Sequence, residues 1–327
     1  MRRVWISKIS ACPEETVLSA LEWLEWHSIV PADARVSIKP NLTYPFYRPG
    51  VTTSPEVLEA VIKVLSTRTH NINIVESDGG SHAWTAETAF KGHRIPEICD
   101  RYGARAVNLT NYTREYAETE VSGRSVRLEM SRLLTRETDL LITMPVPKMH
   151  VMTRVSLGFK NQWGCLPDVK RLRHHPEFAL KVLAINKMLK PGLVIFDGTY
   201  FLNRSGPMDG DAVRMNLLIA SNDIGAGTLA CCELMGIDPF SVAHLRRAIT
   251  ERMMPRTLDD IMLNASIDHF KGPRFFLERS FSQWIGAWLF HSKVATYALY
   301  DSPLAKPAHE ALYLLRGRPK DNISPRW

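Results

Sequence analysis

The chain has 327 residues, of which 45% are hydrophobic and 23% charged, so it can bury a substantial core and global disorder is excluded. A formal net charge of +7 suits anionic substrates or an anionic membrane surface. No Lys/Arg run carries interleaved aromatic residues, so no nucleic acid is expected among the partners. The five cysteines are odd in number and lack Cys-x-x-Cys spacing, which argues against a disulfide scaffold and leaves no ferredoxin-type cluster ligands in the chain.

Strands and helices alternate up to about residue 264. Apolar or alternating runs predict strands at 3–9, 35–39, 71–76, 105–109, 139–144, 192–196 and 215–220. Helical spacing and capping residues predict helices at 13–24, 54–65, 85–90, 95–102, 177–189 and 224–235, and a further one from Pro239. A hairpin is expected between 118 and 129, with its turn at Ser122-Gly123.

This order of elements predicts an α/β fold with a mostly parallel sheet, flanking helices, two lobes around a cleft and a helical C-terminal extension. The expected units are an N-terminal α/β lobe at 1–145, a second α/β lobe at 146–263 and the extension at 264–327. No apolar run approaches the length of a membrane-spanning helix, and the N-terminus lacks the apolar stretch of a signal peptide. A cytoplasmic location is therefore expected.

The central stretch of the chain begins with the buried strand at 139–144. Pro145 and Pro147 end this strand, because proline cannot donate to a strand ladder. Eight cationic or hydrogen-bonding side chains follow it: Lys148, His150, Lys160, Asn161, Lys170, Arg173, His174 and His175. Gly158 and Gly164 bracket Lys160 and Asn161 and would let the backbone approach a ligand closely. The stretch therefore predicts a pocket that collects an anion.

Other predicted strands also end in polar or glycine-containing loops. These loops are Lys39-Pro-Asn41, Glu76-Ser-Asp78-Gly79, Asp197-Gly198 and Ser221-Asn-Asp223. In a parallel sheet the carboxyl ends of the strands share one edge, which is where α/β proteins bind ligands. We therefore expect these loops to converge with the central stretch.

The candidate site has three parts. Acid–base catalysis is assigned to Lys148, His150 and Lys160, because a lysine in a positively charged pocket has a lowered pKa. Binding of phosphate or carboxylate is assigned to Lys39, Asn41, Asn161, Arg204 and His174. Metal binding is assigned to Asp197, Asp209 and Asp223, since carboxylates suit Mg²⁺ or Mn²⁺ and an added histidine would suit Fe, Ni or Zn. Each residue also has a structural alternative: a solvated cation, a turn residue or, for Asp223, a helix N-cap.

An ordered set of motifs resembles the DUF362 family. The set comprises Ile38-Lys-Pro-Asn41, Lys148-Met-His150, Gly158-Phe-Lys-Asn161 with Gly164, Pro191 to Asp197-Gly198, Ser205-Gly-Pro-Met-Asp-Gly210, and Ser221-Asn-Asp223 with Leu234-Met-Gly236. The family name supplies no reaction. The family often has a second Asp five residues after Asp223; this chain has Thr228 there, which puts metal binding at that helix in doubt.

The order of strands and Lys/His loops is also distantly similar to the nickel-dependent lactate racemase group. That resemblance would imply His and Lys in proton and hydride exchange on a hydroxy acid, with a nickel-bearing nucleotide. No catalytic residue of that group maps one by one onto this chain.

The tail beyond residue 264 differs from the rest. Aromatic and basic residues alternate at helical spacing within 272–296, which first indicates an amphipathic helix packed on the main body. The alternative is a peripheral membrane helix or a homo-oligomer contact through the same segment.

The sequence favours an enzyme that acts on a small anionic, phosphate- or carboxylate-bearing substrate or cofactor by Lys/His acid–base chemistry. An isomerase, epimerase or oxidoreductase fits best, a divalent metal is compatible, and the identity of any cofactor is not specified. Two alternatives remain open. One is a redox protein that uses an iron–sulfur or other metal centre borrowed from a partner; the other is a non-enzymatic membrane- or partner-binding module.

Overall fold

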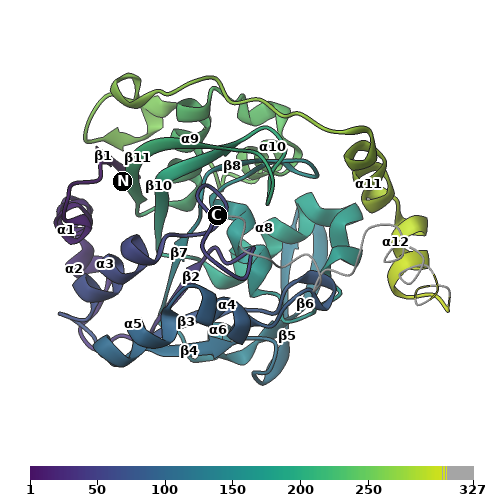
Figure 1. The fold of residues 1–327 in the computed structure, drawn as a ribbon, viewed down its shortest axis with the longest axis horizontal. Helices are drawn as coiled ribbons and strands as arrows, with labels where there is room; N and C mark the ends of the chain where they lie inside the picture. Colours follow the sequence, from purple (N-terminus) through teal and green to yellow (C-terminus); the bar gives the residue numbers. More distant parts are fainter. Residues whose placement is uncertain (304, 306, 308–327) are drawn as a thin grey trace.

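A ten-stranded sheet runs through the centre of the molecule (Figure 1). The computed structural model describes residues 1–303, 305 and 307. The strand order along the sheet is β12-β1-β11-β10-β7-β2-β3-β4, with β8 paired to β10 and β9 paired to β8. The strands are β1 (Arg3–Lys8), β2 (Val36–Pro40), β3 (Ile72–Glu76), β4 (Arg105–Asn108), β7 (Leu140–Met144), β8 (Lys148–His150), β9 (Arg154–Ser156), β10 (Leu193–Asn203), β11 (Asp211–Ser221) and β12 (Met262–Leu263).

Helices flank this sheet, and a separate hairpin of β5 (Arg114–Val121) and β6 (Arg124–Ser131) lies outside it. The longer helices are α1 (Pro13–Trp23), α3 (Pro55–Leu65), α4 (Ala86–Gly92), α5 (Ile95–Tyr102), α8 (Phe178–Leu189), α9 (Ile224–Met235), α10 (Ala243–Thr250), α11 (Phe281–His291) and α12 (Lys293–Tyr300). Short turns of helix complete the fold: α2 (Trp26–Ile29), α6 (Arg132–Arg136), α7 (Gly158–Asn161), η1 (Gly80–His82), η2 (Gln162–Cys165), η3 (Arg171–Glu177), η4 (Pro239–Ser241), η5 (Leu258–Asp260) and η6 (Ile267–Phe270).

The fold is α/β, with a mostly parallel central sheet, as the sequence predicts. Pairing is parallel along the part of the sheet that runs from β10 through β7, β2 and β3 to β4. β11 pairs antiparallel with both β10 and β1, and β9 pairs antiparallel with β8. Parallel strands need both faces covered, and β2, β3 and β7 are indeed buried along their whole length.

The two faces of the sheet bury two separate hydrophobic cores. Successive side chains of a strand point to opposite faces. In β10, Ile195 packs with the core that contains α1 and α3, whereas Val194 and Phe196 pack with the core that contains α8, α9 and α10. Helices therefore cover the sheet on both sides.

The predicted end of the strand at 192–196 is wrong. The sequence placed the end of a strand at Asp197-Gly198, but β10 continues to Asn203 and forms a long hairpin with β11. The register shifts between Gly198 and Tyr200, and a Cβ at Gly198 would lie 2.6 Å from the carbonyl oxygen of Leu217. Glycine thus lets the two strands pass closely at a bulge instead of ending the strand.

Strands from the two predicted lobes are interleaved in one sheet. β7 pairs with β10, and β1 pairs with β11. The boundary expected at residue 145 therefore falls within a sheet rather than between two.

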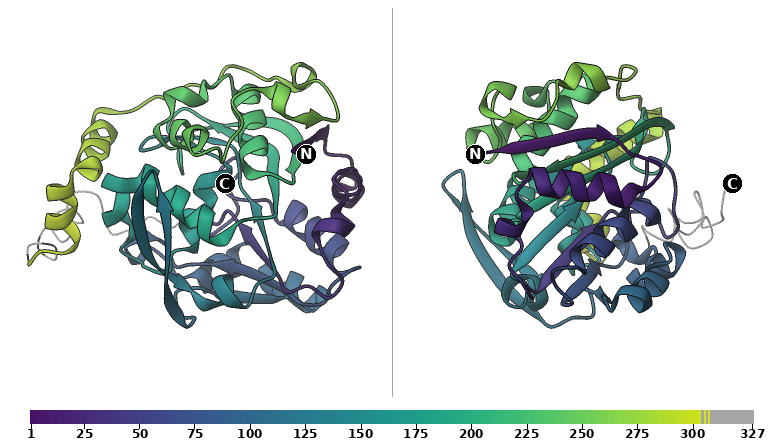
Figure 2. Two further views of the ribbon diagram at one scale, coloured as in Figure 1. Left: turned by 180° about the vertical axis from the view of Figure 1, so that it is seen from behind. Right: turned by 90° about the vertical axis from the view of Figure 1, so that its left-hand side faces the viewer.

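The C-terminal helices α11 and α12 stand at one end of the molecule, after a long connection that crosses it (Figure 2, left). Both helices pack against η3. The helical extension expected from the sequence is therefore present among the described residues. None of the helices in the described part of the chain is long and apolar enough to cross a membrane.

Candidate anion-binding cavity

A cavity of about 1020 Å³ lies between the carboxyl ends of the central strands and the C-terminal helices. Its polar wall consists of Lys39, Asn41, Glu76, Lys148, His150, Lys160 and Arg171. Its apolar wall consists of Ile285, Leu289 and Phe290 of α11 and Leu299 of α12. Three of the strand-end loops expected to converge do meet here: those after β2, β3 and β7.

Lys39 and Glu76 form a buried ion pair at the base of the polar wall. They end the adjacent parallel strands β2 and β3, so their side chains meet, with Nζ and Oε2 2.7 Å apart. The Glu76 carboxylate also accepts hydrogen bonds from the backbone N–H groups of Leu42 at 3.2 Å and Ser77 at 3.0 Å. The charge of this carboxylate is therefore already compensated.

Gly164 makes room for this ion pair. A Cβ at Gly164 would lie 2.8 Å from Oε1 of Glu76 and 3.0 Å from Nζ of Lys39. Gly158 plays a similar part in packing, because a Cβ there would lie 2.6 Å from Oγ1 of Thr228 in α9. Gly164 also lines the cavity, so a close approach of its backbone to a ligand stays a prediction, whereas Gly158 does not line it.

Lys148 is buried beside the cavity and has no carboxylate partner among the described residues. Its Nζ donates to Oδ1 of Asn41 at 3.3 Å and to the carbonyl oxygen of Val51. Burial, followed by the neighbouring charges of Lys160 and Lys39, lowers the pKa of Lys148 well below that of a free lysine. The neutral amine is therefore the form that this environment favours.

Lys160, on α7, is half-buried and is the most available cation of the polar wall. In the described part of the chain, its ammonium group has no hydrogen-bond acceptor and no carboxylate partner; it lies 5.8 Å from the ring centre of Phe178. Burial, with a smaller contribution from Arg171, lowers the pKa of Lys160 to about 8. Lys160 is thus mostly charged at neutral pH and lacks a counterion.

His150 is buried and neutral. Burial, then the charge of Lys160, lowers its pKa well below the usual value for histidine. The backbone N–H of Met152 donates to its Nδ1 at 3.1 Å, so the neutral ring carries its proton on Nε2. His150 can therefore act as a hydrogen-bond donor through Nε2.

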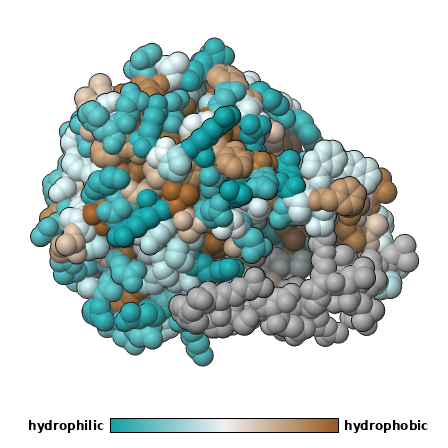
Figure 3. Space-filling model, turned by 45° about the horizontal axis from the view of Figure 1, so that its top comes forward, coloured by the Kyte–Doolittle hydropathy of each residue, from teal (hydrophilic) through white to brown (hydrophobic). Residues whose placement is uncertain are grey.

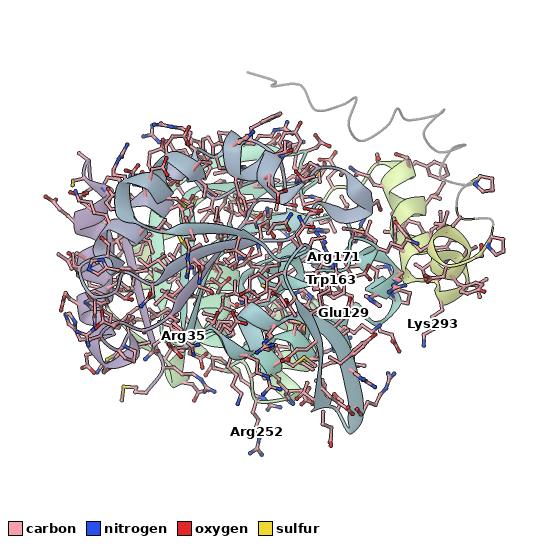
Figure 4. The ribbon with its side chains drawn as sticks, turned by 90° about the horizontal axis from the view of Figure 1, so that it is seen from below. Arg35, Glu129, Trp163, Arg171, Arg252 and Lys293 are labelled. Carbon is pink, nitrogen blue, oxygen red and sulfur yellow. The ribbon has the colours of Figure 1, made fainter. Side chains whose placement is uncertain are left out.

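Asn161 and Arg171 complete the polar side of the cavity. Asn161 donates to the carbonyl oxygen of Lys39 at 2.9 Å and to Oγ1 of Thr143 at 2.8 Å, which fixes α7 to the ends of β2 and β7. Arg171, in η3, donates to the backbone carbonyl oxygen of Asp78 at 2.7 Å. Figure 4 labels Arg171 beside Trp163, next to the C-terminal helices.

The structure gathers six of the eleven residues that the sequence assigned to the site. Those six line the cavity: Lys39, Asn41, Lys148, His150, Lys160 and Asn161. Sequence reasoning missed Glu76 and Arg171 as site residues. Glu76 ends a predicted strand, so the rule that found Lys39 could have found it; Arg171 follows no strand, and only its tertiary position brings it to the cavity.

Arg204 and His174, expected to bind the anion, lie outside the cavity. Arg204 is exposed and forms ion pairs with Asp211 at 2.6 Å and Glu278 at 3.1 Å. His174 lies in a separate surface recess. Its Nε2 lies 3.5 Å from the carboxylate of Asp168, and its Nδ1 shares a hydrogen bond of 2.8 Å with Nζ of Lys181. Both side chains are engaged in local contacts.

The three aspartates expected to bind a metal do not line the cavity either. Asp197 lies within β10 and accepts hydrogen bonds from the backbone N–H of Ser54 at 2.6 Å and from Thr199. Asp209 is exposed in the β10–β11 loop. Within residues 1–303, 305 and 307, no three His, Cys, Asp or Glu side chains are grouped so as to hold a metal ion.

Asp223 lies at the opposite edge of the sheet. Because β11 is antiparallel to β10, the end of β11 pairs with the beginning of β10, as the register of Ser221 with Val194 records. Asp223 there caps α9, accepting from the backbone N–H of Ala226 at 2.7 Å, and pairs with Arg2 at 3.1 Å. The structural alternative, a helix N-cap, is therefore confirmed for this residue.

Comparison with known proteins gives a family and distant structural neighbours. A family model described as "Domain of unknown function (DUF362)" matches residues 36–233. The thylakoid-associated protein sll1697 of Synechocystis sp. is 27% identical over 241 residues, which cover 69% of each chain.

Two solved structures are similar at low identity. The lactate racemase apoprotein of Thermoanaerobacterium thermosaccharolyticum has a TM-score of 0.46 and 14% identity, and the match covers 72% of this chain and 57% of that one. A Thermotoga maritima protein has a TM-score of 0.39 and 13% identity, with 67% and 57% covered. The chain thus spans little more than half the length of these neighbours, and neither similarity bears on function.

Proposed function

The chain belongs to the DUF362 family, and we propose that it is an enzyme that binds an anionic, phosphate- or carboxylate-bearing molecule in the cavity and transfers a proton with lysine and histidine. The single observation that carries this proposal is the ammonium group of Lys160, which faces the cavity without a counterion among the described residues. A desolvated cation without a partner is costly, and a bound anion would compensate for that cost.

The charge balance of the described lining residues supports the same proposal. The cationic lining residues Lys39, Lys160 and Arg171 face the single carboxylate of Glu76, which Lys39 already neutralises. A cavity with an excess of positive charge concentrates anions.

The three candidate catalytic residues have complementary protonation states. Lys160 is mostly charged at neutral pH and would bind the anion. Lys148, as a neutral amine, would donate its two N–H groups to Oδ1 of Asn41 and the carbonyl oxygen of Val51. Its lone pair would then be available to receive a proton. His150 carries a proton on Nε2 and would donate a hydrogen bond through it to the substrate. A base beside a hydrogen-bond donor suits proton abstraction and return by Lys148, as in an isomerase or epimerase.

The test combines binding and exchange. Sulfate and acetate binding is measured by calorimetry for the wild type and for Lys160→Ala, Lys148→Ala and His150→Ala, with Lys91→Ala on exposed α4 as the control. Loss of Lys160 should weaken binding about 10–100-fold, the value of one charge-assisted hydrogen bond.

Exchange of carbon-bound protons with D2O is then followed by NMR for a panel of 2-hydroxy and 2-keto acids. Lys148→Ala and His150→Ala should abolish any exchange that the wild type supports. Unchanged anion binding and exchange in all three variants would remove this proposal.

A second candidate function, peripheral membrane association, is supported by the exposed aromatic residues of α11. Phe281, Trp284 and Trp288 are 83%, 62% and 66% exposed. The exposed basic residues Arg279 and Lys293 flank α11 in the sequence. Trp and Phe next to basic residues are typical of helices that lie in a membrane interface. The C-terminal helices, on the right in Figure 1, present pale to brown surface on the right of Figure 3.

The name of the Synechocystis relative, a thylakoid-associated protein, is consistent with this second candidate. Co-sedimentation with phosphatidylcholine vesicles, with and without phosphatidylglycerol, tests it. Trp284→Ser combined with Trp288→Ser should remove most of the bound fraction, whereas Tyr116→Ser, on an equally exposed aromatic residue of β5, should not. Loss of dimer instead of loss of vesicle binding in the double variant would identify the surface as a homo-oligomer contact.

The redox alternative gains no support from the geometry of the described residues. It stays a prediction, as does the cytoplasmic location.

A further inference from the structure

The cavity has two chemically different walls. The polar wall is formed by strand ends and α7 at the centre of the molecule, whereas the apolar wall belongs to α11 and α12 at its end (Figure 1). Additional apolar side chains, Leu42, Tyr44 and Trp84, line the remaining part. Phe290 of α11 lies 5.9 Å, between ring centres, from His175, which lines the cavity on the side of Lys160. One continuous cavity thus joins a cationic end to an apolar end.

The size of the cavity exceeds the needs of a small anion. Its volume of about 1020 Å³ lies at the upper end of the range of about 300–1,000 Å³ that is usual for ligands of drug size. A two- or three-carbon acid bound at Lys160 would leave the apolar wall without a partner. Apolar surface around an unfilled volume loses contacts, so the remaining space favours an apolar part of the ligand.

Helix α11 has two apolar sides, and only one of them faces the cavity. Ile285 and Leu289, four residues apart, line the cavity. Phe281, Trp284 and Trp288 do not line it and are exposed. A helix that is apolar on both sides is expected where it separates an apolar ligand from an apolar surrounding.

We propose that the ligand is an amphiphile. Its anionic head, a carboxylate or a phosphate, lies at Lys160, and its unbranched apolar chain lies along Leu289 and Phe290 of α11. The inference rests on the proposed anion site for the position of the head, and it adds the class of molecule. It also explains why the helices that cover the cavity are apolar while the strand ends are cationic.

Calorimetry with paired probes tests the proposal. Acetate is compared with decanoate, and inorganic phosphate with decyl phosphate, all below the concentrations at which micelles form. Burial of the added methylene groups should make each long probe bind at least about 100-fold tighter than its short counterpart. Comparison of the two long probes identifies the head group that is preferred.

Variants separate the two ends of the ligand. Leu289→Asp, and independently Phe290→Ser, should bring the affinity for decanoate towards that for acetate. Lys160→Gln should weaken the binding of both probes. Val294→Asp is the matched control, because Val294 is 79% exposed on α12 and does not line the cavity. Circular dichroism verifies that each variant is folded.

Three other results would each contradict a part of the proposal. Binding of the short probes with no gain for the long ones would overturn the amphiphile and leave the anion site in place. If no probe binds, the proposed function fails together with this inference. Decanoate binding that Lys160→Gln leaves unchanged would overturn the position of the head.

Discussion

The pH dependence of anion binding is the sharpest consequence of the position of Lys160. Sulfate is a suitable probe, because its charge is constant from pH 6 to pH 10. With a pKa of about 8, Lys160 is about nine-tenths charged at pH 7 and about one-tenth charged at pH 9. Only the charged form attracts the anion, so the affinity should be nearly full below pH 7 and fall about 10-fold between pH 7 and pH 9.

Substitutions at Lys160 identify the titrating group. Lys160→Gln should bind sulfate weakly and with little dependence on pH in this range, whereas Lys160→Arg, which stays charged, should retain binding at pH 9. Calorimetry at half-unit intervals from pH 6.5 to pH 9.5 measures all three proteins. A wild-type affinity that is constant across this range, or a decline that persists in Lys160→Gln, would refute the reasoning.

Removal of the charge at Lys160 should weaken anion binding but raise the stability of the folded protein. The pKa of Lys160 is lower in the folded protein than in the unfolded chain, so folding with the charged form costs free energy at neutral pH. Lys160→Met should therefore raise the free energy of unfolding at pH 7 by about 1–3 kcal/mol. The wild type becomes more stable as pH rises from about 8 to about 10.5, because the unfolded state binds more protons there, and the difference between the two proteins should shrink over that range. Urea unfolding at pH 7 and pH 10 measures it; a variant less stable than the wild type at pH 7 contradicts the assignment.

Three further predictions concern the stability of the fold. Glu76→Gln leaves the buried ammonium group of Lys39 without its carboxylate partner. The free energy of unfolding, measured by urea titration, should therefore fall by about 3–5 kcal/mol, and a loss below about 1 kcal/mol would show that the pair is not buried as described. Gly164→Ala should cost about 1–3 kcal/mol, because its Cβ would contact the ion pair, whereas Gly286→Ala in α11 has open space and should be neutral or stabilising; equal thermal shifts would contradict this contrast. Asp223→Ala should lower stability by about 1 kcal/mol through loss of a helix cap, and sulfate affinity, measured on the same protein, should not change.

Local sequence patterns were sufficient for most of the central sheet. Buried apolar runs located β2, β3 and β7, because strands covered on both faces have no polar side to obscure the pattern. The polar residues at the ends of β2 and β7 could then be assigned to one edge, since parallel strands end on the same side. Lys39 and Lys148 were found in this way, and they do line one cavity.

The same rule failed where a strand is antiparallel. Asp223 follows a strand, as Lys39 does, but β11 runs in the other direction and leaves Asp223 at the opposite edge. Asp197 was misjudged because a glycine after a strand is compatible with either a turn or a bulge, and only pairing with β11 decides between them.

The sequence by itself determined the α/β alternation, the edge at which the first strand-end loops meet and the residues those loops carry, because these depend on periodicity and on neighbours in the chain. Tertiary structure alone decided that α11 and α12 cover that edge, that Arg171 reaches it and that Lys160 has no counterion among the described residues. Each of these facts depends on packing between segments far apart in the chain, and no local pattern encodes the distance between such segments.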